Sequence, residues 1–299
     1  LNAEVIIMDE PTGRLGAQEM KDFLEYMKYL RSHGKTIIYI SHKLEEIFEI
    51  CDEITVLRDG EVIATYPVAD ITEEQLIKDM VNRSSESLDI QKKVKKLGEP
   101  ILKAEHLSCE KMVEDGSFVL HKGEILGFYG LVGSGRTEMI RALLGIDPLK
   151  SGTIIYKGQE IRFRNIRESM KAGLVLIPEE RRKQGLVMNL SIRKNASLTE
   201  LDSFSRLGFV EQKKEKESVL KLKDNLQLAC ASIENPAGSL SGGNQQKVVL
   251  AKFIDMPVDV YIFDEPTRGI DVGAKSEIYS LIERISEDGA SVIIISSEI

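Results

Sequence analysis

The stretch GLVGSGRTE, from Gly130 to Glu138, decides the fold. It follows the phosphate-binding pattern G-x-x-x-x-G-K-[ST], except that Arg136 stands where the pattern has lysine. The apolar run HKGEILGFYG leads into the loop and the helical pattern RTEMIRALLG follows it, so we expect a strand, a glycine loop and a helix. Loop amides and a helix N-terminus attract phosphate groups. We therefore expect nucleotide contacts along the loop, at Gly130, Gly133, Ser134, Gly135, Arg136, Thr137 and Glu138.

Acids follow two apolar runs: YIFDEPT contains Asp264 and Glu265, and VIIMDEPT near the start contains Asp9 and Glu10. A strand this apolar is typical of a buried parallel sheet, whose carboxyl edge is where ligands bind. We expect Asp264 and Asp9 to hold Mg²⁺, with Thr137 of the glycine loop as a further ligand. Glu265 and Glu10 are expected to polarise an attacking water. An acidic helix cap is the alternative, and the duplication disfavours it.

The most specific stretch is LSGGNQQK, from Leu240 to Lys247. Ser241 is a favoured N-cap residue, and Gly242 and Gly243 leave bare amides at the start of the helix that QQKVVLAKFI continues. A second phosphate-binding N-terminus in one domain is redundant unless it serves a different nucleotide. An ordinary glycine turn before a helix would explain GLVGSGRTE alone, but not the two features together.

The chain contains an internal repeat with an offset of 255 residues, which carries Asp9 onto Asp264 and Gly34 onto Gly289. The same offset carries TIIYISHKL onto SVIIISSEI without a gap. We infer two copies of one unit, of which the first is represented only by its C-terminal part. Because the chain starts without methionine and both ends fall beside strand-like runs, we expect a fragment of a longer protein.

Composition marks the boundary between the copies. EITVLRDGEVIATY alternates and turns at Asp59 and Gly60, which predicts a β-hairpin. ITEEQLIKDMV predicts a closing helix with Thr72 as its N-cap and Gln75 at the capping-box position. The polar, lysine-rich stretch SSESLDIQKKVKKLGEP predicts a linker, either a solvated run or a contact to acidic lipid or a partner. We therefore expect the end of the first copy in residues 1–83, the linker in 84–100 and the second copy in 101–299.

The bulk composition is that of a soluble globular protein: 299 residues, 42% hydrophobic and 29% charged, long enough for about two domains. A formal net charge of −8 argues against a general nucleic-acid binder. No apolar run approaches the roughly 18 residues that span a bilayer, and no signal peptide is recognisable. The three widely spaced cysteines, Cys51, Cys109 and Cys230, predict reduced thiols in a cytoplasmic protein.

Taken together, the glycine loop, LSGGNQQK, the DEPT strands and the strand-terminal ISH resemble ATP-binding cassette (ABC) transporter ATPases. The doubled unit, with GRTE, PEERRKQGLV and DEPTRGIDVGAK, is similar to the tandem ATPase subunits of bacterial monosaccharide importers, ribose importers among them. The resemblance covers essentially the entire chain and is stronger in the second copy. It implies an α/β fold of the P-loop NTPase type, with a mainly parallel core sheet and small antiparallel β elements. A helical subdomain over about Gly185–Phe253 would carry the signature LSGG.

The resemblance also implies roles for single residues. In that family two cassettes pack head to tail, and each ATP lies between the phosphate loop of one cassette and the LSGG of the other. His42 of ISHK would be a switch histidine on the γ-phosphate side, and Asp271 of RGIDVG the D-loop acid that couples the two sites. Glu179 of IPEE stands where most cassettes have the Q-loop glutamine. The nucleotide of the first cassette would be closed in by Ser241, Gly242, Gly243 and Gln245.

The internal repeat compares the two sites directly. At the offset of 255 residues His42 becomes Ser297, and Arg136 replaces lysine with a bulkier planar fork. In the other direction Asp271 falls on Gly16, so the first copy lacks this acid. The second copy has thus lost groups that serve its own nucleotide and kept those that serve its partner's. We expect the site with Glu10 and His42 to hydrolyse ATP, and the site with Arg136 to bind ATP but turn it over slowly.

Two further features are less specific. PEERRKQGLVMNLSIRKNASL, residues 178–198, is either a solvated loop or, as the resemblance implies, the surface that receives a coupling helix from a membrane permease. The remaining histidines are expected to have no functional role. His33 is predicted in a surface turn, and His106 and His121 near strand ends without acidic partners.

We therefore expect an ATP-hydrolysing, Mg²⁺-dependent subunit that drives monosaccharide import through separate permease subunits at the cytoplasmic face of a bacterial membrane. A sugar-binding protein would be an indirect partner, and no nucleic acid is expected. Because the first copy lacks its own phosphate loop and signature here, we expect negligible ATPase activity from this chain alone. The alternatives are a soluble tandem ABC protein acting on ribosomes or DNA, an importer of nucleosides, and a non-catalytic, nucleotide-gated module. The sequence does not identify the sugar.

Overall fold

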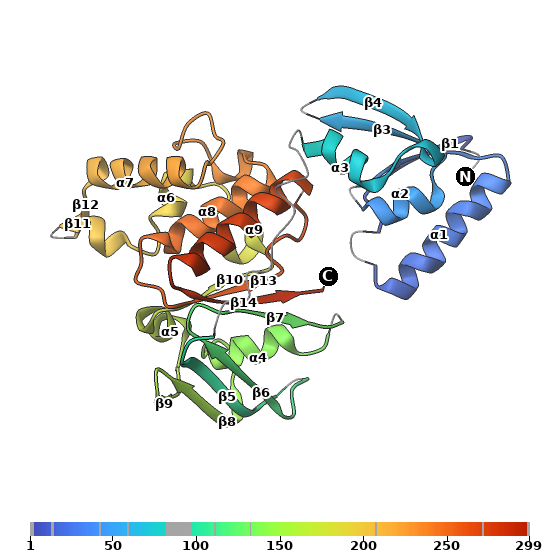
Figure 1. Ribbon diagram of the computed structural model, residues 1–299. Helices are drawn as coiled ribbons and strands as arrows, with labels where there is room; N and C mark the ends of the chain where they lie inside the picture. The colour runs from blue at the N-terminus through green and yellow to red at the C-terminus, as the bar shows by residue number, and fades with distance from the viewer. Residues whose placement is uncertain are drawn as a thin grey trace. The chain divides into compact units, whose positions relative to one another are not determined.

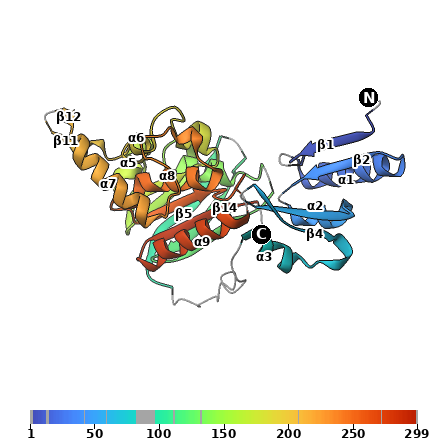
Figure 2. The ribbon, with the colours of Figure 1, turned by 90° about the horizontal axis from the view of Figure 1, so that it is seen from above.

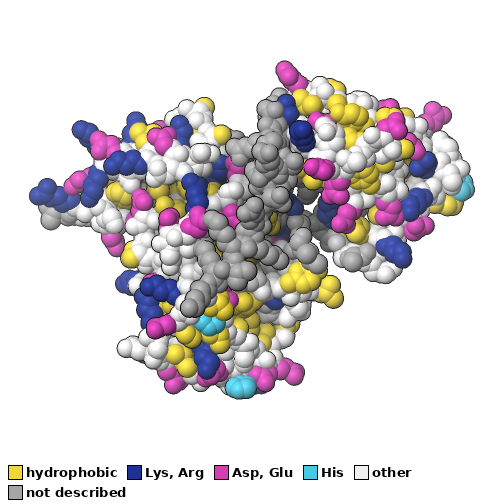
Figure 3. Space-filling view, viewed as in Figure 1, with side chains coloured by type: hydrophobic (Ala, Val, Ile, Leu, Met, Phe, Trp, Pro, Cys, Tyr) yellow, Lys and Arg dark blue, Asp and Glu magenta, His cyan; other side chains and the backbone are white. Residues whose placement is uncertain are grey.

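The computed structural model describes residues 3–12, 15–41, 43–58, 60–81, 97–110, 112–131, 133–206, 208–270 and 272–297. The chain divides into two compact units, Leu1–Lys92 with Asp271–Ser276 and Lys93–Ile270 with Glu277–Ile299. Each unit contains its own strands and helices (Figure 1). On the visible face of each unit, positive and negative side chains are mixed (Figure 3).

The first unit combines a pair of parallel strands with an antiparallel hairpin (Figures 1 and 2). In chain order its elements are β1 (Val5–Asp9), α1 (Ala17–Ser32), β2 (Thr36–Ile40), α2 (Leu44–Ile50), β3 (Glu53–Arg58), β4 (Glu61–Pro67), the 3₁₀ turn Val68–Asp70 and α3 (Glu73–Val81). β3 and β4 form the hairpin that the sequence predicts, with Gly60 in the turn and Asp59 outside the described residues. Six buried side chains tie this hairpin to α2 and α3: Leu44, Ile47, Ile54, Val56, Ile71 and Leu76.

The predicted N-cap of α3 is confirmed. The Gln75 amide donates to the Thr72 hydroxyl oxygen over 3.3 Å, which satisfies one of the free N–H groups at the helix start. The side-chain amide of Gln75 donates instead to Asp79, one helical turn further on, at 2.9 Å. The cap therefore rests on Thr72, while Gln75 forms an i, i+4 pair along the helix surface.

The β1–β2 sheet buries only one of its faces among the described residues. Ile6, Met8, Ile37 and Tyr39 are half-buried. The alternate positions are between 48% and 68% exposed: Val5, Ile7, Ile38 and Ile40. The sequence predicts buried strands here, and within the described residues that prediction is wrong for this face. Alternation along a strand places successive side chains on opposite faces, so a layer on one side leaves the other side open.

The second unit holds more elements. In chain order they are β5 (Pro100–Cys109), β6 (Gly116–His121), β7 (Ile125–Tyr129), α4 (Arg136–Leu143), β8 (Leu149–Tyr156), β9 (Gln159–Ile161), α5 (Ile166–Ala172), β10 (Leu174–Ile177), the π-helical turn Arg181–Gly185, α6 (Ile192–Ala196), the 3₁₀ turn Leu201–Phe204, β11 (Ser205–Arg206), β12 (Phe209–Val210), α7 (Gln212–Asn225), the 3₁₀ turn Ala237–Ser239, α8 (Gly242–Ile254), β13 (Val260–Asp264), α9 (Val272–Glu287) and β14 (Ser291–Ser296). β5 begins at Pro100, which the sequence places in the linker.

Two sheets organise this unit. The parallel sheet has the strand order β10-β13-β14-β7, and the antiparallel sheet has the order β6-β5-β8-β9. Helix α4 packs between them through Ile140 and Leu143, while α8 and α9 lie on the other side of the parallel sheet (Figure 1). β13 is buried at all five positions, as the sequence predicts. Because β7, β14 and β13 run parallel, the carboxyl ends of β7 and β13 lie at one edge, where the glycine loop begins.

The predicted helical subdomain is present and contains a small β-hairpin that the sequence does not predict. α6 and α7 pack on α8, and β11 pairs with β12 beside them. Arg193 of α6 joins the parts of this subdomain by ion pairs to Glu215 of α7 and to Glu234, the latter at 2.9 Å. Glu215 is only 2% exposed and also accepts a hydrogen bond from Ser197. This buried network fixes α6 and α7 relative to the segment that leads into α8.

Candidate functional site: the carboxyl edge of the parallel sheet

The glycine loop joins β7 to α4, as the sequence predicts. Gly135 caps α4 with φ 87°, a left-handed conformation that glycine adopts without steric cost. A Cβ atom at Gly135 would also lie 2.8 Å from Cγ2 of Val113 and 3.0 Å from the carbonyl oxygen of Met112. Both the backbone angle and the available space therefore require glycine at the start of the helix. The N-terminus of α4 is left open to an anion, which its free N–H groups favour.

Thr137 and Asp264 meet at this edge. The Thr137 hydroxyl lies 3.1 Å and 3.0 Å from the two carboxylate oxygens of Asp264, although the residues are 127 positions apart. Asp264 is 3% exposed, and its burial raises the pKa from the ordinary 3.8 to about 6. The Thr137 hydrogen bond opposes this rise, while the Glu265 charge adds to it. A hydroxyl and a carboxylate converging in this way offer the hard oxygen ligands that Mg²⁺ takes alongside phosphate oxygens, so the residues present fit Mg·nucleotide.

The two acidic turns share one backbone conformation. Glu265 has φ 45° and donates its N–H to the carbonyl of Ile295 at 2.9 Å. Glu10 has φ 43° and donates its N–H to the carbonyl of Ile40, also at 2.9 Å. A left-handed glutamate is unusual and strained, and it marks a position where the chain turns sharply out of a strand. The repeat therefore places both glutamates at the end of a strand in the same way.

Arg136 is engaged with the backbone. Its guanidinium donates to the carbonyl of Ser296 at the end of β14 and to the carbonyl of Leu131 in the loop, the latter at 3.2 Å. The residue after Ser296 is the exposed Ser297, which occupies the position of His42 in the first copy. The two substitutions that distinguish this site by sequence are thus neighbours at the end of β14.

The signature stretch caps α8. Ser241 is the N-cap residue, and its hydroxyl oxygen accepts from the Asn244 amide group at 3.0 Å and, weakly, from the Asn244 backbone at 3.5 Å. Gln245 has no exposed surface: its side chain donates to the carbonyl of Leu240 at 2.9 Å and accepts from Arg182 at 3.3 Å. These contacts therefore lie within the second unit, with the residue before the signature helix and with the turn that follows β10.

The residue expected at the Q-loop position forms an ion pair. The carboxylate of Glu179, half-buried just after β10, pairs with the guanidinium of Arg268, three residues after Glu265. Neither the pair nor Arg268 is predicted from the sequence. The repeat gives one hint that Arg268 has a role specific to the second copy. The corresponding residue of the first copy is Gly13, which is uncharged.

A buried acid in the first unit is also missed by the sequence reasoning. Glu46 of α2 is 1% exposed and accepts hydrogen bonds from Thr12, the last residue of the first DEPT turn, and from Tyr39 at 2.6 Å. Ser41 donates to it over 3.3 Å, and the Lys43 ammonium lies 3.3 Å away. Desolvation pushes the pKa of Glu46 upward, but the donors and the ammonium outweigh it and hold the pKa below its ordinary value. An acid in the first turn of a helix is ordinary in sequence, so nothing marked it.

Some predictions on single residues are corrected or lie outside the described residues. His106 and His121 both have acidic partners, contrary to the prediction: Nδ1 of His106 lies 2.9 Å from Asp115, and Nδ1 of His121 lies 3.0 Å from Glu124. His33 is exposed, as predicted, with its ring 4.1 Å from that of Tyr29. His42 and Asp271, the expected switch and D-loop residues, lie outside the described residues. The three cysteines are unpaired.

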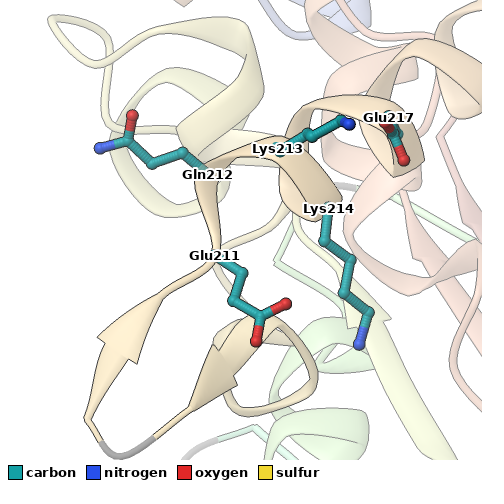
Figure 4. Close-up of a pocket in the computed structure, with 5 residues that line it drawn as sticks. All are labelled: Glu211, Gln212, Lys213, Lys214 and Glu217. Carbon is teal, nitrogen blue, oxygen red and sulfur yellow. The ribbon is translucent and has the colours of Figure 1, made fainter.

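A shallow hollow lies away from this edge, at the start of α7. It is lined by Glu211, Gln212, Lys213, Lys214 and Glu217, whose side chains point in different directions and do not converge on one point (Figure 4). Across the part of the chain that the structure describes, no three His, Cys, Asp or Glu side chains are grouped to hold a metal ion. Nor is any described helix long and apolar enough to cross a bilayer.

Comparison with known proteins agrees with the resemblance to ABC transporter ATPases that the motifs indicate. A family model described as ABC transporter matches residues 113–268. Ribose import ATP-binding protein RbsA 3 of Rhizobium meliloti (strain 1021) is 45% identical over 296 residues, covering 99% of this chain and 59% of that protein. RbsA of Bacillus subtilis (strain 168) is 45% identical over 298 residues, covering 100% of this chain and 60% of its own length. The galactose/methyl galactoside import ATP-binding protein MglA of Treponema denticola is 40% identical over 301 residues, covering 99% of this chain and 60% of its own length.

The chain thus spans about three fifths of the length of these curated relatives. Among solved structures, a nucleotide-free ATP-binding cassette from an ABC transporter superposes with a TM-score of 0.57 at 19% identity, over 67% of this chain and 82% of that one. A cassette bound to ADP and Pi, in a dimeric post-hydrolysis state, gives a TM-score of 0.56 at 18% identity, over 67% of this chain and 88% of that one. At this identity the likeness concerns the fold, and it confirms the predicted P-loop cassette architecture.

Proposed function

The chain belongs to the ABC transporter family, and on that premise we propose that it is the ATP-binding subunit of a bacterial monosaccharide importer. It binds and hydrolyses ATP at the cytoplasmic face of the membrane, where transmembrane permease subunits hold it. A separate binding protein delivers the sugar to the permease. One observation carries the proposal: the whole chain matches ribose import ATP-binding proteins at 45% identity.

In this proposal the edge of the parallel sheet is the nucleotide site of the second copy. The loop residues Gly133, Ser134 and Gly135 and the start of α4 receive the phosphates. Thr137 and Asp264 would hold Mg²⁺, which when bound neutralises charge on the phosphates. Glu265, placed at the strand end by its left-handed backbone, orients the attacking water.

The two nucleotide sites of the assembled protein are unequal in this proposal. Glu10 and His42 serve a hydrolytic site, on which the signature Ser241–Gly243 closes. GLVGSGRTE and Glu265 serve a site that binds ATP and turns it over slowly. Two observations support slow turnover at this second site. The guanidinium of Arg136 donates to backbone carbonyls, and Ser297 stands where the first copy has the imidazole of His42.

Residues 178–198 are the proposed contact to the permease. Glu179 lies at the start of this segment, at the Q-loop position of the family, and its ion pair with Arg268 links the segment to the turn that follows Glu265. A shift of this segment on permease binding would therefore act on an element of the nucleotide site. The acidic net charge and the mixed surface charges favour this reading over one in which the chain binds ribosomes or DNA.

Transport measured in reconstituted membranes tests the proposal. The full-length protein, a candidate permease from the same organism and its binding protein are placed in proteoliposomes. Uptake of radiolabelled ribose, xylose, galactose and a nucleoside is then followed with Mg·ATP. Uptake of one monosaccharide that stops without Mg·ATP is expected. Uptake of the nucleoside alone, or no uptake together with co-sedimentation on ribosomes, would replace the sugar-import proposal.

A further inference from the structure

The segment that follows β10 places the guanidinium of Arg181 between the turn after Glu265 and the start of the signature helix α8. Arg181, the first residue of the π-helical turn, donates to the carbonyl of Arg268 at 2.7 Å and to the carbonyl of Gly269 at 2.8 Å. These carbonyls belong to the turn that continues from Glu265. Arg181 thus ties the segment after β10 to the backbone that leaves the acidic turn.

The same guanidinium touches the start of the signature helix. A Cβ atom at Gly242, the first residue of α8, would lie 2.8 Å from Nη2 of Arg181 and 2.9 Å from the carbonyl oxygen of Gly269. Such distances are too short for any side chain, so glycine at this position leaves room for the arginine and for the turn. Gly242 is therefore needed inside this unit, as a seat for Arg181.

Further contacts hold the whole turn against α8. Arg182 donates to the side chain of Gln245 at 3.3 Å, and Lys252 donates to the carbonyl of Gly185. A Cβ atom at Gly185 would lie 2.9 Å from Cγ2 of Val249, so the end of the turn also packs directly on the helix. The turn Arg181–Gly185 is thus attached along the first three turns of α8 and cannot shift without affecting it.

No acid among the described residues pairs with Arg181. Among the described residues its hydrogen-bond partners are two backbone carbonyls, and its Nε is buried without a partner. Desolvation, and then the neighbouring Arg182, lower the pKa of Arg181. A half-buried guanidinium that is not paired with a carboxylate costs stability, which argues for a role other than stabilising the fold.

We propose that Arg181 is a positioning residue that couples the segment after β10 to both the start of the signature helix and the turn following Glu265. This inference rests on the proposed function, because residues 178–198 are the proposed permease contact. The guanidinium makes the three elements move together, so a displacement at the permease side reaches the signature and the acidic turn in one step. Lysine can reproduce only part of this link, since its ammonium keeps the charge and the donors but lacks the planar fork that holds two carbonyls in a fixed geometry.

The test measures ATPase rates of the full-length protein with and without its permease. Arg181→Gln is expected to lower the permease-stimulated kcat by about fivefold or more, while the basal rate and the KM for ATP change by less than about twofold. Arg181→Lys should retain part of the stimulation. The matched control is Arg167→Gln in α5, an exposed arginine outside residues 178–198, and it should behave as wild type.

Equal losses of basal and stimulated rates in Arg181→Gln would overturn the proposal, as would full stimulation. Amide hydrogen exchange on this chain gives an independent measurement that does not need the permease. In Arg181→Gln the amides of residues 242–245 and 268–270 should exchange faster, with those of α7 unchanged; unchanged exchange at both places would overturn the link itself. If the wild-type protein shows no stimulation by any permease, the proposed function fails, and the exchange result alone decides on the link.

Discussion

The turn Asp9–Thr12 and the turn Asp264–Thr267 have the same four residues and the same backbone, yet different side chains hold them. Thr12 donates to the buried carboxylate of Glu46, whereas Thr267 shares a 3.3 Å hydrogen bond with the phenol of Tyr279. At the position of Tyr39, a second donor to Glu46, the second copy has Ile294. The strand pairing specifies the turn in both copies. Tyr39 and Tyr279 are not repeated between the copies, and the position of Glu46 corresponds to 301, outside the given sequence.

The strands that lead into these turns also differ between the two units, here in the burial of their apolar side chains. Apolar side chains on the open face of β1 and β2 correspond by the repeat to buried ones in β13 and β14: Val260, Ile262, Ile293 and Ile295. In the second unit the β5–β8 layer and α4 cover that face, whereas at the offset of 255 residues the counterparts of these elements fall before Leu1, outside the given sequence. Identical apolar patterns thus have different burial because burial depends on the neighbouring layer, which a strand's own sequence does not contain.

Removal of the Glu46 carboxylate should produce the largest difference between the turns. Glu46→Ala leaves the Lys43 ammonium and three hydroxyl donors without their acceptor, and we expect a loss of about 3 kcal/mol in the first unit. Amide hydrogen exchange should show protection of β2 and α2 falling about 100-fold, with β13 and β14 unchanged. Glu45→Ala removes the adjacent exposed acid and serves as control. Loss of protection in both units, or in neither, would contradict separate support of the turns.

The two phenols offer a matched pair. Tyr39→Phe removes a 2.6 Å hydrogen bond to a charged acceptor, and we expect about 2 kcal/mol lost in the first unit. Tyr279→Phe removes the long bond to Thr267, the one hydrogen bond of this phenol among the described residues, for which about 0.5 kcal/mol is expected in the second unit. The measurement is the exchange protection of β2 in one variant and of β14 in the other. If Tyr279→Phe costs as much as Tyr39→Phe, the supports are equivalent after all.

The buried acid of the second turn predicts a pH dependence. Asp9 is exposed, while Asp264 is buried with a pKa raised by burial to about 6. Only the carboxylate form binds Mg²⁺, so Mg²⁺-dependent affinity for a fluorescent ATP analogue should fall about tenfold from pH 7 to pH 5. Since the folded pKa is the higher one, the folded protein binds the proton more tightly, and this acid destabilises the fold increasingly as pH rises from about 4 to about 6.

A titration without Mg²⁺ separates this effect from protonation of the nucleotide itself. Without Mg²⁺ the affinity for the ATP analogue should change little between pH 7 and pH 5, because protonation of Asp264 then removes no ligand from a bound metal ion. An equal fall with and without Mg²⁺ would show that Asp264 has no part in it.

The sequence predicts what neighbouring residues determine. The strand, loop and helix around Gly135, the hairpin at Gly60 and the caps at Thr72 and Ser241 all depend on local patterns, and all are present. It does not predict Glu46, whose donor Thr12 is 34 residues away, or the contact of Arg181 with carbonyls 87 and 88 residues on. These groups meet only through the packing of separate elements. Their residue types are ordinary in sequence, so no local pattern marks them.

The most direct test of the unequal sites compares Glu10→Gln with Glu265→Gln. Both glutamates have the same left-handed backbone and the same hydrogen bond to the adjoining strand, so the two substitutions are structurally equivalent changes. Steady-state ATPase activity is measured on the full-length protein assembled with its permease. Glu10→Gln should lower kcat about 100-fold or more, while Glu265→Gln should leave a large part of it. Equal losses from the two substitutions would contradict the account.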